Sequence, residues 1–243
     1  MRRRHRFRST LAAILTLAAV TASGCAREGH AVPVQSALPG CDAVVMIVLD
    51  ASLSMEATDV APSRLAAATG ALGSYAHRSA PQTALGLVTF AGTASTLVTP
   101  TTNRDAIDAA LRTVRLAERT ATGEGIFTAL ATIATVDKIV APPGGRRIIL
   151  VSDGKQTLPA DLNDPRGAYT AARQAASDGV TVSTISLGTP TGTVAIPGPD
   201  ATHTVPVPTD DESLREIARL GSGTFHTATA AEHLTTALST PAC

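Results

Sequence analysis

Apolar runs alternate along this chain with segments of helical periodicity. Four runs predict strands, at residues 44–49, 83–90, 147–152 and 180–187. The first run (VVMIVL) has no polar interruption, as is typical of a parallel strand that is buried on both faces. Apolar residues recur at helical spacing in residues 65–75, 107–114, 126–133, 169–176, 214–217 and 230–238. Strands that alternate with helices predict right-handed βαβ crossovers, and therefore a doubly wound, mostly parallel α/β sheet with helices on both faces.

Other segments predict edges, caps and insertions. Residues 96–99 predict a short strand that ends at Pro100, which suits a sheet edge because proline has no amide hydrogen to donate. Asn103 can cap the helix that follows it. Residues 188–208 are rich in proline and glycine and predict a hairpin-like insertion. Residues 209–212 (TDDE) form a capping box for the next helix.

The first 24 residues have the features of a secretory signal sequence. Five arginines precede an apolar core at residues 11–22, which is too short for a stable membrane span. Residues 22–25 (ASGC) resemble a bacterial lipobox, in which the cysteine becomes the lipidated first residue of the mature chain. We therefore expect export, lipidation of Cys25 and anchoring to the outer face of the cell membrane. An ordinary cleavage site beside an incidental cysteine is the alternative.

The two remaining cysteines, Cys41 and Cys243, bracket the predicted folded region. In an oxidising compartment we expect a disulfide between them, with two free thiols as the alternative. Residues 25–40 have no periodic pattern and predict a tether that reaches at most ~50 Å from the lipid to the domain. Residues 41–243 then form one domain that is large enough to bury a sizeable core.

The charge balance argues against a nucleic-acid partner. The chain has 20 basic and 20 acidic residues, and residues 1–24 contain five arginines and no acidic residue, so their removal leaves 15 against 20, a net charge of −5. The chain also has only four Phe, two Tyr and no Trp. Such a protein offers neither the basic surface nor the stacking surface that nucleic acids require.

Polar side chains follow the first predicted strand at the point where it ends. Asp50, Ser52 and Ser54 form an Asp-x-Ser-x-Ser sequence that brings one carboxylate and two hydroxyls to a single strand tip. Ligands bind at the carboxyl ends of strands in open α/β sheets. A carboxylate beside neutral oxygens suits Mg²⁺, which needs only one or two carboxylates because it keeps several waters. A strand-to-helix cap with polar turn residues is the alternative.

Two later residues could join this strand tip. Thr120 lies in an Arg-Thr-Ala-Thr-Gly sequence that enters a predicted helix, and Asp153 follows the strand at residues 147–152. Taken singly, Thr120 also fits a helix N-cap and Asp153 a turn before a glycine. Glu56 and Asp59 are predicted to be solvated loop charges, with additional metal ligands as the alternative. The six histidines show no metal-ligand spacing and are predicted to be surface or packed residues.

Together these motifs resemble a von Willebrand factor type A (VWA) domain. An apolar strand leads into Asp-x-Ser-x-Ser, a Thr-x-Thr-Gly helix entry follows about 70 residues later, and a strand ending in Asp-Gly follows about 30 residues after that. The resemblance covers roughly residues 42–238. It implies a Rossmann-like fold with a six-stranded, mostly parallel sheet and one short antiparallel edge strand.

The resemblance also implies a metal-ion-dependent adhesion site (MIDAS). Ser52 and Ser54 would bind the metal directly through their hydroxyls, and Thr120 would join when a partner engages. Asp50 and Asp153 would mainly hold the metal's waters. Because the direct ligands are mostly neutral, Mg²⁺, or Mn²⁺ in its place, would stay electrophilic and accept a carboxylate from a partner as its last ligand.

The resemblance favours a binding function. Arg119 and Leu53 stand where family members often have glycine, although neither change removes a ligand. Residues 188–218 also resemble bacterial cell-envelope members of the family, which are often tied to the membrane near their N-terminus. We therefore expect a monomeric, lipid-anchored extracytoplasmic module, not an enzyme, that recruits a protein or envelope component through an acidic residue.

Two other functions remain open. The first is a structural envelope protein with an unused metal site. The second is a serine hydrolase, which is disfavoured because the sequence has no Gly-x-Ser-x-Gly elbow and no histidine at a strand end beside Ser52 or Ser54.

Overall fold

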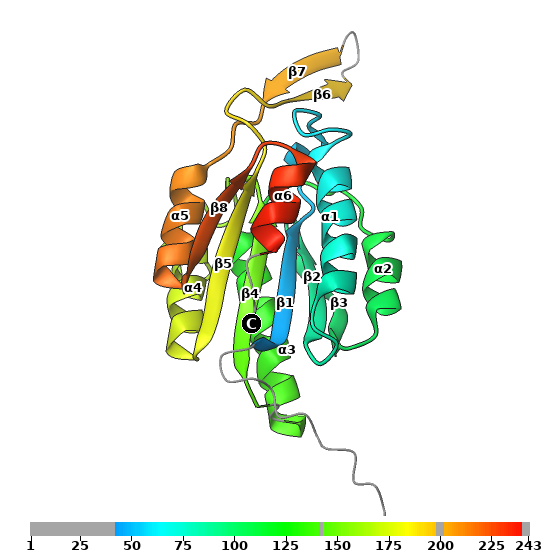
Figure 1. The fold of residues 1–243 in the computed structure, drawn as a ribbon. Coiled ribbons are helices and arrows are strands. Elements are labelled where there is room, and N and C mark those ends of the chain that lie inside the picture. Colours follow the sequence, from blue (N-terminus) through cyan, green and yellow to red (C-terminus); the bar gives the residue numbers. More distant parts are fainter. Residues whose placement is uncertain (1–41, 141–142, 198–201, 240–243) are drawn as a thin grey trace, which may run out of the picture. The chain divides into compact units, whose positions relative to one another are not determined.

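The computed structural model describes residues 42–140, 143–197 and 202–239, in which six strands form one sheet (Figure 1). The strands of this sheet are β1 (Asp42–Asp50), β2 (Ala84–Phe90), β3 (Ala94–Thr101), β4 (Gly145–Ser152), β5 (Val180–Leu187) and β8 (Ser222–Ala228). Their order in space is β3-β2-β1-β4-β5-β8, so the strand that carries the Asp-x-Ser-x-Ser sequence is central.

The strand directions confirm the predicted sheet. β1 pairs in parallel with β2 and β4, and the parallel pairing continues through β5 to β8. Only β3 is antiparallel to its neighbour, at one edge of the sheet. This strand is longer than the predicted one, because it continues through Pro100 to Thr101.

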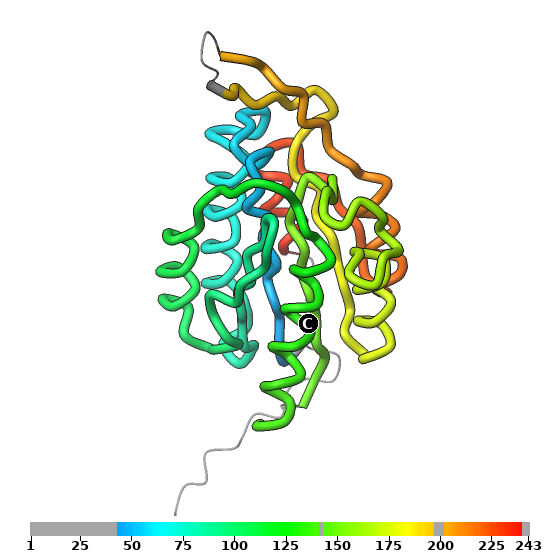
Figure 2. The backbone as a smooth tube through the Cα atoms, turned by 180° about the vertical axis from the view of Figure 1, so that it is seen from behind, coloured from blue at the N-terminus to red at the C-terminus, as the bar shows by residue number. Residues whose placement is uncertain are grey.

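Helices cover both faces of the sheet, as predicted. One face carries α1 (Arg64–Arg78), α2 (Arg104–Leu111) and α6 (Ala231–Leu238), and the other carries α3 (Thr122–Ile139), α4 (Ala168–Ser177) and α5 (Asp211–Leu220). Figure 2 shows the second face, with α3 and α4 in front of the strands. A 3₁₀ helix, η1 (Leu53–Glu56), follows β1 directly.

The core explains why the first strand has no polar interruption. Val45, Ile47 and Leu49 belong to the apolar cluster under α1, α2 and α6. The intervening residues of β1 belong to the cluster under α3, α4 and α5. Residues 44–49 are all fully buried, because successive side chains of a strand point to opposite faces and both faces are covered.

Two local predictions had different outcomes. Asn103 caps α2, since its side chain accepts hydrogen bonds from the amides of Asp105 and Ala106. The capping box at residues 209–212 is wrong by one residue. Asp210 is the N-cap of α5, and its carboxylate accepts a hydrogen bond from the Ser213 amide at 3.1 Å.

The proline-rich insertion contains a two-stranded antiparallel hairpin, β6 (Thr193–Pro197) and β7 (Thr202–Pro206), above the carboxyl ends of the parallel strands (Figure 1). Its two ends meet at its base, where the Val207 amide donates to the Gly192 carbonyl at 2.8 Å. β6 contacts η1, so the hairpin lies against the loop that follows β1.

The expected signal sequence, the lipid attachment at Cys25, the tether and both cysteines of the expected disulfide, Cys41 and Cys243, lie outside the described residues. No helix in the described part of the chain has the length and apolar character that crossing a membrane requires.

Candidate metal centre

The end of β1 brings Asp50, Ser52 and Ser54 together. The Asp50 carboxylate accepts a hydrogen bond from the Ser52 amide at 2.8 Å. The hydroxyls of Ser52 and Ser54 lie 2.9 Å apart and share a hydrogen bond. One carboxylate and two hydroxyls therefore lie at the carboxyl end of the central strand, as the sequence predicts.

The end of the neighbouring strand β4 contributes Ser152 and Asp153. The Ser152 hydroxyl donates to the second oxygen of Asp50 at 2.6 Å and accepts from the Gly154 amide at 2.9 Å. Sequence analysis did not single out Ser152, because a serine at the end of a strand carries no motif of its own. Both Asp50 and Asp153 are buried, with exposed fractions of 0% and 2%.

Burial raises the cost of ionising both carboxylates. Burial, followed by the negative charge of Asp153, raises the pKa of Asp50 to about 7. Burial also raises the pKa of Asp153, although the neighbouring Ser54 and Arg64 oppose that rise. Buried acids with raised pKa values mark candidate functional sites.

The donor set fits a hard divalent cation. Asp153 Oδ1 is buried and has no hydrogen-bond partner among the described residues. A buried, unpaired carboxylate oxygen is costly unless another group satisfies it. A cation beside Asp50 and Asp153 would favour their ionised forms, and the serine hydroxyls add the neutral oxygens that Mg²⁺ accepts.

Thr120 lies on a segment that runs beside the loop after β1. Ala117 forms a parallel bridge with Ser52, and its amide donates to the Ala51 carbonyl at 2.8 Å. Thr120 itself is held through its backbone, since its amide donates to the Thr157 hydroxyl at 2.8 Å. The alternative of a helix N-cap is wrong, because α3 begins at Thr122 and Ala121 occupies the cap position.

A fully buried arginine joins this site to the hairpin. Arg64, the first residue of α1, donates two hydrogen bonds to Asp59, at 2.7 and 2.8 Å. The same guanidinium donates to Asp153 Oδ2 at 3.0 Å and to the Val207 carbonyl at 2.9 Å. We call these residues, with Thr189, the Arg64 clamp.

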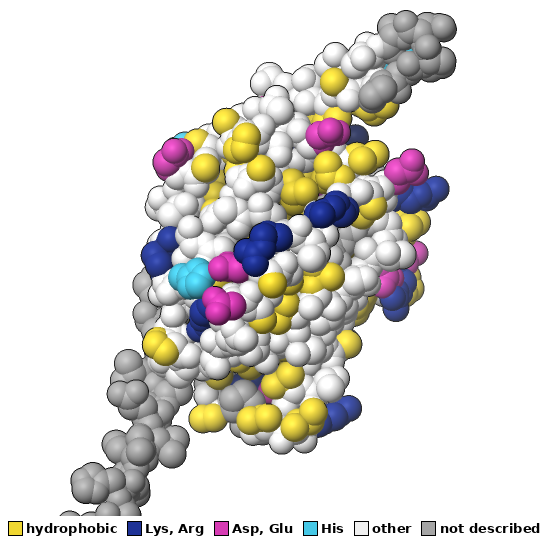
Figure 3. Space-filling model, turned by 90° about the vertical axis from the view of Figure 1, so that its right-hand side faces the viewer, with side chains coloured by type: hydrophobic (Ala, Val, Ile, Leu, Met, Phe, Trp, Pro, Cys, Tyr) yellow, Lys and Arg dark blue, Asp and Glu magenta, His cyan; other side chains and the backbone are white. Residues whose placement is uncertain are grey.

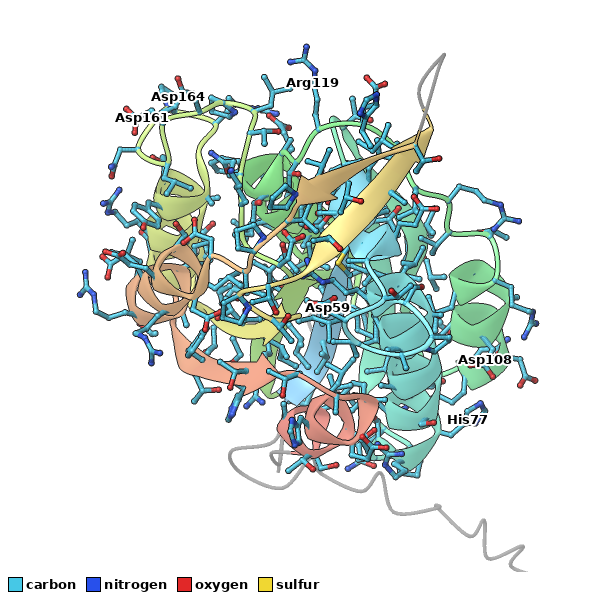
Figure 4. The ribbon with its side chains drawn as sticks, turned by 90° about the horizontal axis from the view of Figure 1, so that it is seen from above. Asp59, His77, Asp108, Arg119, Asp161 and Asp164 are labelled. Carbon is cyan, nitrogen blue, oxygen red and sulfur yellow. The ribbon has the colours of Figure 1, made fainter. Side chains whose placement is uncertain are left out.

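The Arg64 clamp corrects the prediction for Asp59. The Asp59 side chain is only 12% exposed, so it is not a solvated loop charge. Besides Arg64, it accepts hydrogen bonds from the amide and the hydroxyl of Thr189 at 2.7 and 2.8 Å. Sequence gave no signal for this contact, because Thr189 is 130 positions away. Figure 4, which looks down on the carboxyl end, shows Asp59 near the middle of the view.

A second group of potential ligands lies on the outer side of α1 and α2. His77 Nε2 and Asp108 Oδ2 lie 2.7 Å apart, and the ligand atoms of these residues and Asp105 are all within 4.8 Å of one another (Figure 4). The histidine lies on one helix and the two acids on the other, so spacing along the sequence could not reveal the group. The His77 side chain is 52% exposed, and exposed pairs of this kind contribute little to stability.

The fold and a sequence comparison define the class of this protein. Residues 45–156 match the profile of the von Willebrand factor type A domain, and this stretch contains Asp50, Ser52, Ser54, Thr120 and Asp153. The chain therefore carries a VWA domain. It resembles UPF0353 proteins over most of its length.

Two UPF0353 proteins illustrate this similarity in sequence. The chain is 51% identical to a UPF0353 protein of Mycolicibacterium vanbaalenii over 200 residues, which are 81% of this chain and 58% of the relative. It is 52% identical to a UPF0353 protein of Nocardia farcinica over 206 residues, or 82% of this chain and 62% of the relative. The chain thus spans less than two thirds of the length of these relatives.

Solved structures support the fold. An aerotolerance-related membrane protein from Bacteroides fragilis matches with a TM-score of 0.69 at 24% identity, over 82% of this chain and 98% of that protein. BatB from Bacteroides thetaiotaomicron matches with a TM-score of 0.66 at 26% identity, over 81% and 97%. Proximal thread matrix protein 1 from the mussel byssus, described with zinc in its MIDAS motif, matches with a TM-score of 0.57 at 17% identity, over 83% and 45%.

Proposed function

We propose that this VWA domain is a metal-dependent binding module. Ser52, Ser54 and Thr120 would hold a divalent cation, and Asp50 and Asp153 would hold its waters. The observation that carries the proposal is the buried pair of carboxylates, one of which has an oxygen without a partner in the described structure. When bound, Mg²⁺ or Mn²⁺ would supply an electrophilic position for an anionic ligand.

The neutral and the charged residues of the site would have different roles. Neutral hydroxyls leave most of the cation's charge uncompensated, so that an acidic side chain of a partner is attracted to the open position. Ser152 and the Ser52 amide orient Asp50 through hydrogen bonds at 2.6 and 2.8 Å, and Arg64 holds one oxygen of Asp153 at 3.0 Å. The partner would be a protein or an envelope component.

We further propose that the module is exported and anchored by a lipid on Cys25. The basic and apolar leader and the ASGC sequence support this arrangement. One structural neighbour is described as a membrane protein. Because β1 runs from Asp42 to Asp50, the proposed tether would join the sheet at the end opposite to the candidate metal centre.

The test is thermal unfolding of the full chain with Mg²⁺ or Mn²⁺ titrated against EDTA. A ligand that binds only the native state stabilises it by about 2.7 kcal/mol at 100 times its dissociation constant. We expect a metal-dependent rise in unfolding temperature that Asp50→Ala abolishes. Asp161→Ala removes an exposed carboxylate at the same end of the molecule and should leave the rise unchanged.

A third variant excludes the outer cluster. If His77→Ala abolishes the rise and Asp50→Ala does not, the cation binds between α1 and α2 and the proposal is wrong. If no protein responds to metal, a structural envelope role with an unused site becomes the better account.

We propose that the domain is not an enzyme. In the described part of the chain, no histidine hydrogen-bonds to Ser52 or Ser54, and the Ser52 hydroxyl pairs with that of Ser54. A hydrolytic serine needs an adjacent base. Turnover of generic ester substrates that Ser52→Ala abolishes would overturn this part of the proposal.

A further inference from the structure

Each of the three loops that carry predicted metal ligands also carries an exposed side chain. Leu53 lies between the two serines and is 41% exposed. Arg119 precedes Thr120 and is exposed. Leu158, which is 39% exposed, follows Asp153 in the third loop, and its amide donates to the Thr120 carbonyl at 3.1 Å. Exposed side chains therefore flank the predicted metal ligands along the chain in all three loops.

Arg119 has an unusual backbone. Its φ angle is +69°, in the left-handed region where a side chain is disfavoured and glycine is not. The Arg119 side chain lies beside Gly92: a Cβ atom at Gly92 would be in ordinary van der Waals contact with it, 3.6 Å from Arg119 Cβ and 3.8 Å from its Cδ. Outliers of this kind that a fold retains cluster at functional sites.

The guanidinium of Arg119 makes no polar contact within the described structure that would stabilise its left-handed backbone conformation. It has no hydrogen bond or ion pair with any described residue, in contrast to Arg64, Arg146 and Arg166. In Figure 4 its side chain points outward at the carboxyl end of the molecule. The Arg119 guanidinium, one residue before the predicted metal ligand Thr120, is therefore available to bind an anionic group of another molecule.

Apolar side chains gather at the same end. Seven large hydrophobic side chains are exposed in the described structure, and four of them, Leu53, Leu158, Ile196 and Val205, lie on the loop after β1, the loop after β4 or the hairpin. The hairpin strand β6 contacts η1. The candidate metal centre and Arg119 therefore lie at the end of the sheet that also carries these exposed apolar side chains.

We propose that Arg119 binds a second acidic side chain of the partner, next to the carboxylate that completes the metal shell. The partner is then a polypeptide segment with two acidic residues close together and apolar residues beside them. A guanidinium binds a carboxylate with two parallel hydrogen bonds, and the apolar side chains favour a polypeptide over a simple polyanion. This inference rests on the proposed function and specifies its partner.

The test uses random nine-residue peptides displayed on phage, selected on the full chain in Mg²⁺ and eluted with EDTA. Peptides selected by the wild type are expected to carry two acidic residues within three positions, and those selected by Arg119→Gln only one. A synthetic wild-type-selected peptide should bind Arg119→Gln about tenfold more weakly, as the loss of one charge-assisted contact predicts.

A second variant separates the charge of Arg119 from its backbone. Arg119→Gly and Arg119→Gln both remove the charge and should weaken peptide binding to a similar extent. Only Arg119→Gly relieves the left-handed conformation, so it alone should raise the unfolding temperature, by about 2–4 °C. Circular dichroism checks that both variants are folded.

The outcomes separate this inference from the proposed function. If no peptide is enriched by Mg²⁺ over EDTA, or if Asp50→Ala enriches the same peptides, metal-dependent binding fails and the inference fails with it. If Mg²⁺-dependent peptides carry one acidic residue and bind Arg119→Gln as tightly as the wild type, the role of Arg119 is wrong and the proposed function stands. An unfolding temperature that Arg119→Gly does not raise would show that this conformation carries no strain.

Discussion

Arg64 is a guanidinium with no exposed surface that makes four hydrogen bonds to three residues. Burying such a charge is costly, and only close carboxylates and carbonyls offset the cost. Asp59 accepts two of these hydrogen bonds and Asp153 Oδ2 accepts one. Asp153 Oδ1 has no hydrogen-bond partner among the described residues and so remains available at the candidate metal centre. The same arginine thus pairs with Asp59 and orients Asp153 of the candidate metal centre.

The clamp predicts a large effect for Asp59→Asn. Asp59→Asn removes one of the two carboxylates that pair with the buried Arg64 guanidinium, so we expect a loss of about 3 kcal/mol in unfolding free energy at pH 7. Chemical denaturation measures this loss. Asp137→Asn is the matched control, because Asp137 also pairs with an arginine but is 34% exposed; it should cost less than about 1 kcal/mol. Equal effects of the two variants would contradict a special role for the clamp.

The effect of Asp59→Asn should also depend on pH. Burial opposes ionisation of Asp59, but hydrogen bonds from Arg64 and Thr189 outweigh it and lower its pKa below the ordinary 3.8. A lowered pKa in the folded state means stabilisation that is present above that ordinary value and is lost as the pH falls through the lowered one. The stability difference between wild type and Asp59→Asn should therefore shrink below about pH 4.

At the scale of elements, the turn that follows β5 packs against the Arg64 clamp. Gly188, which directly follows β5, has a φ angle of +134°. A Cβ atom there would lie 2.5 Å from Arg64 Cζ and Nε. The connection between the sheet and the hairpin therefore requires glycine for two separate reasons.

Gly188→Ala should displace Arg64, whereas Gly179→Ala should not. Gly179 also has a positive φ angle, +71°, but a Cβ atom there would meet no neighbour within 4 Å. We expect Gly179→Ala to cost about 1 kcal/mol from backbone strain alone, and Gly188→Ala to cost at least about twice that. Urea denaturation gives both values. A Gly188 variant no less stable than the Gly179 variant would mean that the turn moves without disturbing Arg64.

At the scale of the whole molecule, the chemistry is concentrated at one end of the sheet. The two apolar clusters hold the strands from both faces, and the candidate ligands all follow strand ends or enter a helix at the carboxyl edge. The face over α1 and α2 carries acidic, basic and histidine side chains interspersed, with no large area of one sign (Figure 3).

The remaining prediction at this scale concerns the two cysteines that bracket the domain. We expect Cys41 and Cys243 to form a disulfide in the exported protein. Closing a loop of about 200 residues stabilises the fold by at most about 5 kcal/mol in the chain-entropy model. Non-reducing peptide mapping should recover the two cysteines in one linked fragment. Cys41→Ser and Cys243→Ser should lower the unfolding temperature equally, and the double variant no further; two free thiols in the wild type would contradict the prediction.

Sequence could predict the parts of the site that are local. The apolar run of β1 and the polar residues after it lie next to one another, so their periodicity and spacing predict a strand and its tip. The Arg64 clamp could not be predicted, because Arg64 and Asp153 are 89 positions apart. In the sequence, Arg64 looks like any other basic residue at the start of a helix. Asp59 was predicted to be solvated for the same reason: its partners become visible only when the loops are brought together.

The closed base of the hairpin has an evolutionary consequence. The chain enters and leaves β6 and β7 at neighbouring points, where the backbones of Gly192 and Val207 are hydrogen-bonded. The length and surface of the two strands can therefore change without displacing the loops of the candidate metal centre. Replacement of the hairpin in evolution would thus leave the candidate metal centre unchanged.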